Sequence, residues 1–193
     1  GHSASTDLKL SLDDIMMQMK SNTRNEIKRA IKEGCRFEYN YNYEDFVSFY
    51  KDFSLNKGLN DNMDIHTLAK YDKMIITIAK KDGKPLAMHA TVINKKDKVA
   101  MLFYSCSQRF SEDTDRKLRG WAKRYLHFKD LELFKEIGMV RYEWHSVCMD
   151  KSRPANYNIG QFKLSFGGEL YPTISLKTPM FIFMKFIQKL ISK

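Results

Sequence analysis

Cysteine, proline and glycine are all scarce in this sequence, with 3, 4 and 9 occurrences among 193 residues. The three cysteines, Cys35, Cys106 and Cys148, are odd in number and far apart, which argues against a disulfide framework and against a cysteine-based metal site. Their free thiols indicate a reducing cytoplasm. With so little proline and glycine there is no flexible linker. The sequence therefore predicts one domain over residues 1–193.

Long hydrophobic runs are missing as well. No stretch approaches the roughly 18 apolar residues that a transmembrane helix needs. Residues 1–3 have the composition of a cloning remnant, and no signal peptide pattern follows them. Apolar residues still make up 43% and aromatic residues 13% of the chain, enough for a core that buries roughly 70% of the unfolded surface. We expect a globular cytoplasmic protein that holds no metal.

Acidic residues are outnumbered by basic ones, 23 against 33, which gives a formal net charge of +10. Such a balance favours an anionic partner, namely a nucleic acid, a membrane surface or a phosphorylated small molecule. The net charge alone does not show which of these three partners the protein binds. Solubility alone is the simplest alternative.

Hydrophobic periodicity predicts an alternation of helices and strands. A helical extension over residues 10–34, with a polar interruption near Ser21, precedes a strand over 35–43. The turn at Asp82-Gly83 is a strong hairpin signal. We predict further helices over 44–53, 64–71, 116–137 and 159–166, and further strands over 74–80, 86–93, 98–105, 139–148 and 169–176. The order predicts an α/β layer fold with a mixed sheet.

This order of elements, with an extra helix in front, resembles the GNAT N-acyltransferase fold, a mixed and mostly antiparallel sheet flanked by helices. Local motifs resemble the Fem-type peptidoglycan-bridge transferases within that superfamily. They are Arg24–Gly34, Leu126–Phe128, Phe134–Gly138, Tyr142–Trp144 and, most specifically, Ile159–Gly168 with its Phe-Gly-Gly ending. Fem-type transferases carry two such domains and a helical arm, and they use aminoacyl-tRNA. This chain is more similar in size to short relatives that acylate amino sugars for surface polysaccharides.

The resemblance implies an acyl-CoA-dependent N-acyltransferase. Its acceptor would be the amino group of a nucleotide-linked amino sugar used in surface-polysaccharide or O-antigen (lipopolysaccharide) synthesis. The amine would attack the acyl thioester directly in a ternary complex. One alternative is a Fem-type transferase that uses aminoacyl-tRNA, and another is a non-catalytic binding module that keeps the fold.

The GNAT loop that binds the cofactor pyrophosphate has the pattern Q/R-x-x-G-x-G/A at the start of the long helix. Lys117-Leu118-Arg119-Gly120-Trp121-Ala122 fits this pattern with lysine in the first position, and Arg116 adds charge. A helix N-terminus offers free backbone N–H groups to a phosphate. A basic, solvated helix start is the alternative.

The same resemblance implies that the pantetheine arm of the cofactor pairs with the exposed edge of the strand before that helix. An open strand edge is a ready partner for an amide-bearing chain. This would place the arm along Tyr104, Ser105 and Cys106. We expect the Cys106 side chain itself to be a small buried thiol and not a nucleophile.

Four residues are candidates for proton transfer, which amine acylation requires. Glu143 and His145 alternate with Tyr142 and Trp144, so they share one face of a strand. We take Glu143 as the first choice of base and His145 as its rival or helper, with a merely solvated face as the alternative. His89 is a third candidate, with a structural role as the alternative. The resemblance suggests Tyr157 as the acid for the departing thiolate, unless it is simply a loop tyrosine.

The C-terminal segment 181–191 is apolar, with Lys185 and Lys189 on one helical face. Such a segment is suited to lie on an anionic membrane, which would place the protein at the inner face of the membrane. A terminal helix docked on the sheet is the alternative. Eleven methionines and the many aromatic residues leave room for a homodimer interface.

Overall fold

The computed structural model describes residues 1–59, 63–71, 74–108 and 116–174. The predicted amphipathic segment 181–191 lies outside the described residues. In chain order the elements are β1 (His2–Asp7), α1 (Leu12–Gln18), α2 (Ser21–Lys32), β2 (Arg36–Asn40), α3 (Tyr43–Lys57), α4 (Ile65–Ala69), β3 (Met74–Lys81), β4 (Lys84–Asn94), β5 (Val99–Ser107), α5 (Arg116–Glu136), β6 (Arg141–Ser146), α6 (Pro154–Leu164) and β7 (Glu169–Pro172).

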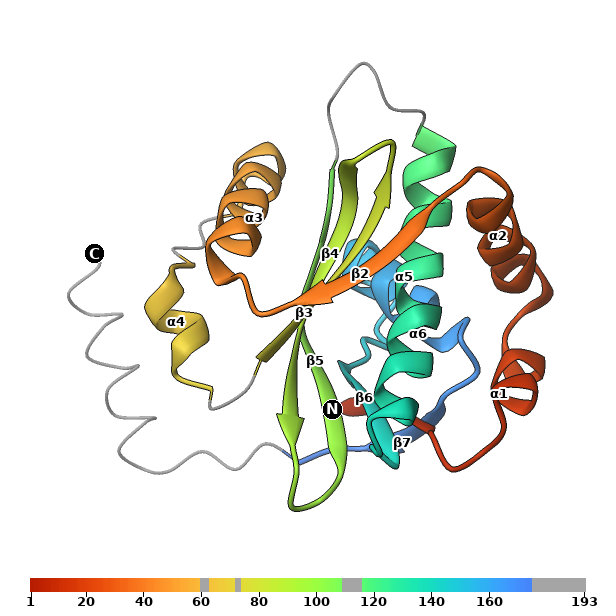
Figure 1. Cartoon of the computed structure of the whole chain (residues 1–193). Helices are drawn as coiled ribbons and strands as arrows, with labels where there is room; N and C mark the ends of the chain where they lie inside the picture. The colour runs from red at the N-terminus through yellow and green to blue at the C-terminus, as the bar shows by residue number, and fades with distance from the viewer. Residues whose placement is uncertain (60–62, 72–73, 109–115, 175–193) are drawn as a thin grey trace, which may run out of the picture.

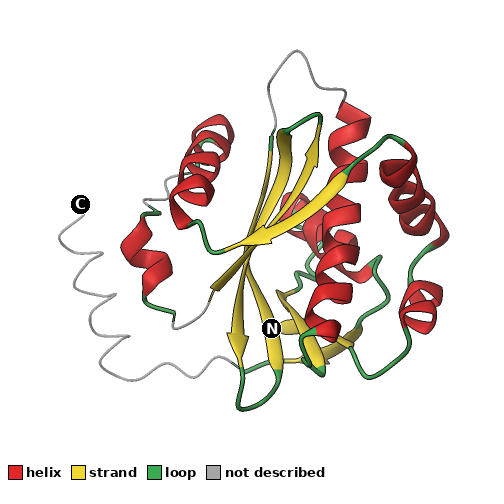
Figure 2. Cartoon of the chain, in the orientation of Figure 1, coloured by secondary structure: helices red, strands yellow, loops and turns green. Residues whose placement is uncertain are grey.

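All strands join one sheet, in the order β2-β3-β4-β5-β6-β1-β7. Every neighbouring pair is antiparallel except β5 and β6, which are parallel because α5 crosses over between them. Helices α3 and α4 cover one face, and α1, α2, α5 and α6 lie on the other (Figure 1). Figure 2 shows the same layers by secondary structure. The predicted mixed, mostly antiparallel sheet flanked by helices is confirmed.

Two hydrophobic clusters hold the helices on the sheet. The larger one lies under α1, α2, α5 and α6 and includes the fully buried Tyr142, Trp144 and Phe166. The smaller one lies under α3 and α4 around Phe46 and Ile76. Side chains of a strand alternate between the two faces, so Tyr142 and Trp144 fill the first cluster while Glu143 between them points the other way.

The first strand is the main departure from the sequence prediction. Residues 1–3 were set aside, but His2 and Ser3 belong to β1, which lies between β6 and β7. Ala4 and Thr6 are buried, and the indole N–H of Trp144 donates to the Thr6 hydroxyl at 2.9 Å. The N-terminus thus completes the sheet beside the strand that carries Glu143 and His145.

The helix boundaries follow local chemistry. The predicted extension is split near Ser21 as expected, with α1 ending at Gln18. Helix α6 begins at Pro154, five residues before the predicted start at 159, because proline is favoured in the first turn. Gly167 has φ +81°, and a Cβ there would lie 2.4 Å from the Gln18 carbonyl oxygen. This left-handed backbone and the close approach of Gln18 explain why glycine is favoured at this position after α6.

Candidate functional site

The two parallel strands at the centre of the sheet separate after three residue pairs. Val99, Ala100 and Met101 pair with Arg141, Tyr142 and Glu143, and the register ends there. Both strands continue, β5 to Ser107 and β6 to Ser146. Within the described part of the chain, the edge of β5 beyond Met101 therefore has no partner strand. We call this opening the β5–β6 wedge.

A β-bulge lies where the wedge opens. On the other side of β5, Ala90 pairs with Tyr104 and Thr91 pairs with Leu102, so Phe103 is an extra residue. A bulge leaves the extra residue outside the regular ladder and re-aims its backbone groups. The main chain at Phe103 is thereby turned relative to the rest of β5, at the mouth of the wedge.

His145 lies across the wedge from this bulge. Its ring meets the ring of Phe103 edge-on, with centroids 5.0 Å apart. Its φ of +58° is uncommon for a residue with a side chain and accompanies a second bulge, between β6 and β1. Its Nε2 atom is buried and has no hydrogen-bond partner among the described residues. Burial lowers the pKa of His145, the charge of Lys163 lowers it further, and Glu143 opposes both.

Glu143 is held by donors on both sides. Arg141 Nε lies 2.8 Å from one carboxylate oxygen, and the Tyr171 hydroxyl donates to the other at 2.5 Å. Burial and this carboxylate raise the pKa of Tyr171 to about 12. Since both of its oxygens are engaged, Glu143 is less free to take a proton than His145.

An open groove of about 660 Å³ lies beside this carboxylate. Three acidic side chains, Asp7, Asp97 and Glu169, line it together with the two residues that hold Glu143. Its full lining is Ser5, Asp7, Lys9, Asp97, Val99, Val140, Arg141, Glu169 and Tyr171. We call it the acidic groove. Glu143 pairs with the last residue of β5 before the wedge, so it stands between the groove and the wedge.

The predicted pyrophosphate loop is helical in the structure. Helix α5 begins at Arg116, so Gly120, Trp121 and Ala122 lie in its second turn, where backbone N–H groups are bonded within the helix. Ala122 is fully buried, and Trp121 packs against the larger cluster. The described part of this helix starts at Arg116, so the motif residues Gly120, Trp121 and Ala122 lie within the helix and not in a loop.

The three residues predicted along the pantetheine arm differ in where their side chains lie. Cys106 is fully buried, its thiol donates to the Met88 carbonyl at 3.4 Å, and burial raises its pKa. The predicted burial of this thiol is confirmed. Tyr104 packs against Phe46 and Tyr50 in the smaller cluster. Ser105 Oγ is buried without a hydrogen-bond partner among the described residues. Because the side chains of Tyr104 and Cys106 pack in the smaller cluster, these two residues are suited to face the wedge only through their backbone.

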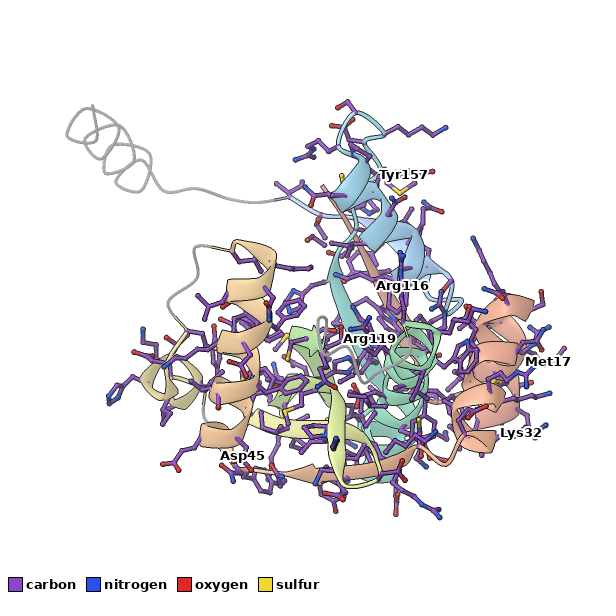
Figure 3. The ribbon with its side chains drawn as sticks, turned by 90° about the horizontal axis from the view of Figure 1, so that it is seen from above. Met17, Lys32, Asp45, Arg116, Arg119 and Tyr157 are labelled. Carbon is purple, nitrogen blue, oxygen red and sulfur yellow. The ribbon has the colours of Figure 1, made fainter. Side chains whose placement is uncertain are left out.

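His89 and Tyr157 do not join His145 and Glu143. His89 is fully buried under α5, where its Nδ1 lies 2.6 Å from Asp130 Oδ2. This position agrees with a structural role for His89 and not with direct contact with a substrate. Tyr157 lies inside α6 and not in a loop. Figure 3 shows it apart from Arg116 and Arg119 at the start of α5.

Sequence comparisons find no relative. No family model matches the chain, and no curated protein matches it. None of the helices in the described part of the chain combines the length and the apolar character that crossing a bilayer requires.

Solved structures, in contrast, share the fold. FemX is 12% identical with a TM-score of 0.77, and the match covers 95% of this chain and 64% of that one. L-PGS from Bacillus licheniformis is 14% identical with a TM-score of 0.61, covering 100% of this chain and 65% of that one. An aminoglycoside acetyltransferase from an uncultured soil metagenomic sample, crystallised with sisomicin, is 12% identical with a TM-score of 0.51, covering 77% and 99%.

The fold is therefore of the GNAT type, as the sequence resemblance predicted. The chain spans less than two thirds of the length of FemX and of L-PGS. At these identities the similarity establishes the fold alone.

Proposed function

We propose that this chain is an N-acyltransferase that binds an acyl thioester in the β5–β6 wedge and an amine in the acidic groove. The observation that supports this most directly is the placement of His145, with an unpartnered Nε2, across the wedge from the bulge at Phe103. A titratable group with a perturbed pKa beside an open strand edge is a candidate for acid–base chemistry.

The donor is acyl-CoA. Its amide-bearing arm suits the open edge of β5, as an added strand would. The re-aimed backbone at Phe103 is suited to polarise the thioester carbonyl. The described start of α5 carries the basic side chains of Arg116 and Lys117, whose charge is suited to the pyrophosphate. Arg119 adds a guanidinium nitrogen that is buried without a hydrogen-bond partner among the described residues.

The reaction is a direct transfer. The neutral amine attacks the thioester carbon, a C–N bond forms, and the C–S bond breaks. His145 takes the proton that the attacking nitrogen loses, and the departing thiolate is protonated in turn to give free CoA. Glu143, fixed by Arg141 and Tyr171, orients the amine and balances the positive charge that develops on its nitrogen as the C–N bond forms. In this scheme His145 is the base and Glu143 the positioning residue, the reverse of the order favoured by the sequence.

The acceptor is an amino sugar. The three carboxylates of the acidic groove favour a protonated amine in a chain whose net charge is +10. An aminoglycoside, the acceptor class named for one structure with this fold, is itself an amino sugar. Lys9 and Arg141 at the same groove are suited to the phosphates of a nucleotide-linked sugar used in surface-polysaccharide synthesis.

The test is the melting temperature of the purified protein with acetyl-CoA, followed by mass spectrometry of mixtures with amino sugars. A ligand at about 100 times its Kd adds about 2.7 kcal/mol to the free energy of unfolding, which is several degrees for a domain of this size. We expect a rise in melting temperature and an acylated product. No rise with any acyl-CoA would overturn the proposal.

An aminoacyl-tRNA donor is the second candidate, favoured by the TM-score of 0.77 to FemX. This alternative predicts that tRNA binding weakens steeply as the salt concentration rises, because each phosphate that the protein neutralises makes the binding constant more dependent on salt. Transfer from charged tRNA but not from acyl-CoA would select it.

A further inference from the structure

Three side chains of the types that commonly bind metal ions lie close together on the face of the sheet opposite the acidic groove. His127 and Asp130 lie three residues apart on α5, a spacing that puts both on one side of a helix. His89 reaches them from β4. All three are at most 2% exposed, and one ligand atom from each lies within 4.8 Å of the others. This group is distinct from the wedge and takes no part in the proposed acyl transfer.

Most of the polar atoms in this group lack a partner within the described part of the chain. His89 Nδ1 bonds Asp130 Oδ2 at 2.6 Å, and the Tyr142 hydroxyl donates to the same oxygen at 3.2 Å. His89 Nε2, both ring nitrogens of His127 and Asp130 Oδ1 have none. An unmade hydrogen bond in the interior costs about 1–3 kcal/mol, so a cluster with four such atoms lacks partners that a bound species could supply to some of them.

We propose that His89, His127 and Asp130 form a buried binding site for a divalent transition-metal ion, with Zn²⁺ as the best match. Two imidazoles and one carboxylate are a donor set that zinc and iron accept, whereas Mg²⁺ and Ca²⁺ prefer oxygen alone. His89 Nδ1 and Asp130 Oδ2 lie 2.6 Å apart, so an ion would bind these two atoms in place of the proton that they share, together with a ring nitrogen of His127.

The site is structural, because aromatic rings close it to substrates. The rings of Trp144, Phe162 and Phe166 lie with their centroids 5.1, 5.4 and 5.1 Å from that of His127. A metal held there would link α5 to β4 directly. Since the site is closed, the ion would enter as the chain folds, and its binding would add to the free energy of folding.

The experiment uses the full chain. The protein is unfolded with a chelator, freed of chelator, and refolded with or without one equivalent of Zn²⁺. We expect about one zinc per chain to survive gel filtration, consistent with coupling of metal binding to folding, and a higher melting temperature than in the zinc-free sample. Equal melting temperatures and no retained zinc would overturn the proposal and leave the four atoms to buried water.

Histidine variants test whether the zinc ion binds at this site. His127→Asn should reduce zinc affinity by more than about tenfold, while His66→Asn on the exposed side of α4 and His2→Asn near the terminal amine should not. Retention of zinc by His127→Asn, or its loss in either control, would contradict the site. If His127→Asn does not fold, X-ray absorption of the zinc-loaded wild-type protein decides: two imidazoles and oxygen at about 2.0–2.2 Å support the site, and sulfur ligands overturn it.

Discussion

At the scale of single residues, two side chains on β6 share the proposed chemistry unequally. His145 offers an unpartnered nitrogen beside Phe103, whereas both oxygens of Glu143 are engaged by Arg141 and Tyr171. A general base must have a free lone pair within reach of the proton. The proposal therefore makes His145 the base and Glu143 the positioning residue, the reverse of the order that the sequence favoured.

The first prediction concerns these two residues. His145→Gln should lower kcat by about 10²–10⁴-fold, the usual contribution of a general base, and leave the rise in melting temperature with acetyl-CoA intact. Glu143→Gln should mainly raise the KM of the amine. Steady-state kinetics with both substrates varied measures both. A loss of kcat in Glu143→Gln with little change in His145→Gln would reverse the assignment.

The second prediction is the pH dependence of the rate. Burial holds the pKa of His145 below its usual 6.5, and the base is active only when deprotonated. The acid limb of kcat/KM should therefore rise with pH to a midpoint below 6.5, and this limb should vanish in His145→Gln. A midpoint near 8 would instead point to Lys163, whose pKa burial lowers to about 8.

A third prediction follows from that lysine. Its folded pKa of about 8 lies below the ordinary 10.5, so between these values the unfolded chain binds more protons and stability rises with pH. Lys163→Met should be more stable than wild type below pH 8, and the gap should narrow as pH rises to 10.5. Urea unfolding across this range measures it. A gap that does not change with pH would show that the ammonium is not desolvated.

At the scale of elements, two glycines form a matched pair. A Cβ at Gly167 would clash with the backbone of Gln18, and its φ of +81° disfavours any side chain. A Cβ at Gly120, inside α5, would meet nothing within 4 Å. Gly167→Ala should thus destabilise the protein, whereas Gly120→Ala should stabilise it by about 0.5–1 kcal/mol.

Denaturant unfolding of the two variants tests this fourth prediction, and Gly120→Ala carries a second result. The cofactor motif contains Gly120, yet the structure places its N–H within the helix. We expect acetyl-CoA binding to survive this change. If Gly120→Ala lost acetyl-CoA binding without losing stability, the result would support the pyrophosphate loop that the sequence motif predicts.

Most elements could be predicted because their signals are local. The turn at Asp82-Gly83 joins β3 and β4 as expected, and the glycines that end α5 and α6 stand where periodicity stops. β1 was missed because a short polar segment at the terminus has no pattern of its own, and only pairing with β6 and β7 makes it a strand.

The candidate site was predicted only in part, because its parts come together by tertiary packing. The alternation of Glu143 and His145 showed their shared face, but the partners of Glu143 and the bulge at Phe103 depend on neighbouring strands. His89 and Asp130 are 41 residues apart, and only the fold joins them. The spacing of His127 and Asp130 on one helix was the signal available in the sequence.

At the scale of the whole molecule, the sheet separates the two proposed sites. α1, α2, α5 and α6 close one face over the larger cluster and the histidine site, and α3 and α4 cover part of the other (Figure 1). The acidic groove is lined by residues of β1, β5, β6 and β7 and of the turns beside them. In the proposed reaction, positive charge at the described start of α5 attracts the phosphate-bearing donor, and negative charge in the groove attracts the cationic acceptor.

The fifth prediction is the effect of salt. Raising ionic strength should weaken acetyl-CoA binding, because it screens the attraction of phosphates to Arg116, Lys117 and Arg119. It should also raise the KM of a cationic amine. Calorimetry at several salt concentrations checks the first effect and kinetics the second. Binding of acetyl-CoA that is indifferent to salt would contradict the position given to the pyrophosphate.

The central claim is that the β5–β6 wedge holds the acyl donor, and hydrogen–deuterium exchange with and without acetyl-CoA tests it most directly. The account predicts slower exchange at residues 102–107 of β5 and in the first turn of α5, because these amides gain hydrogen-bond partners. The outer strand β2 should not change. Protection confined to β2, or no protection at saturating acetyl-CoA, would contradict the account.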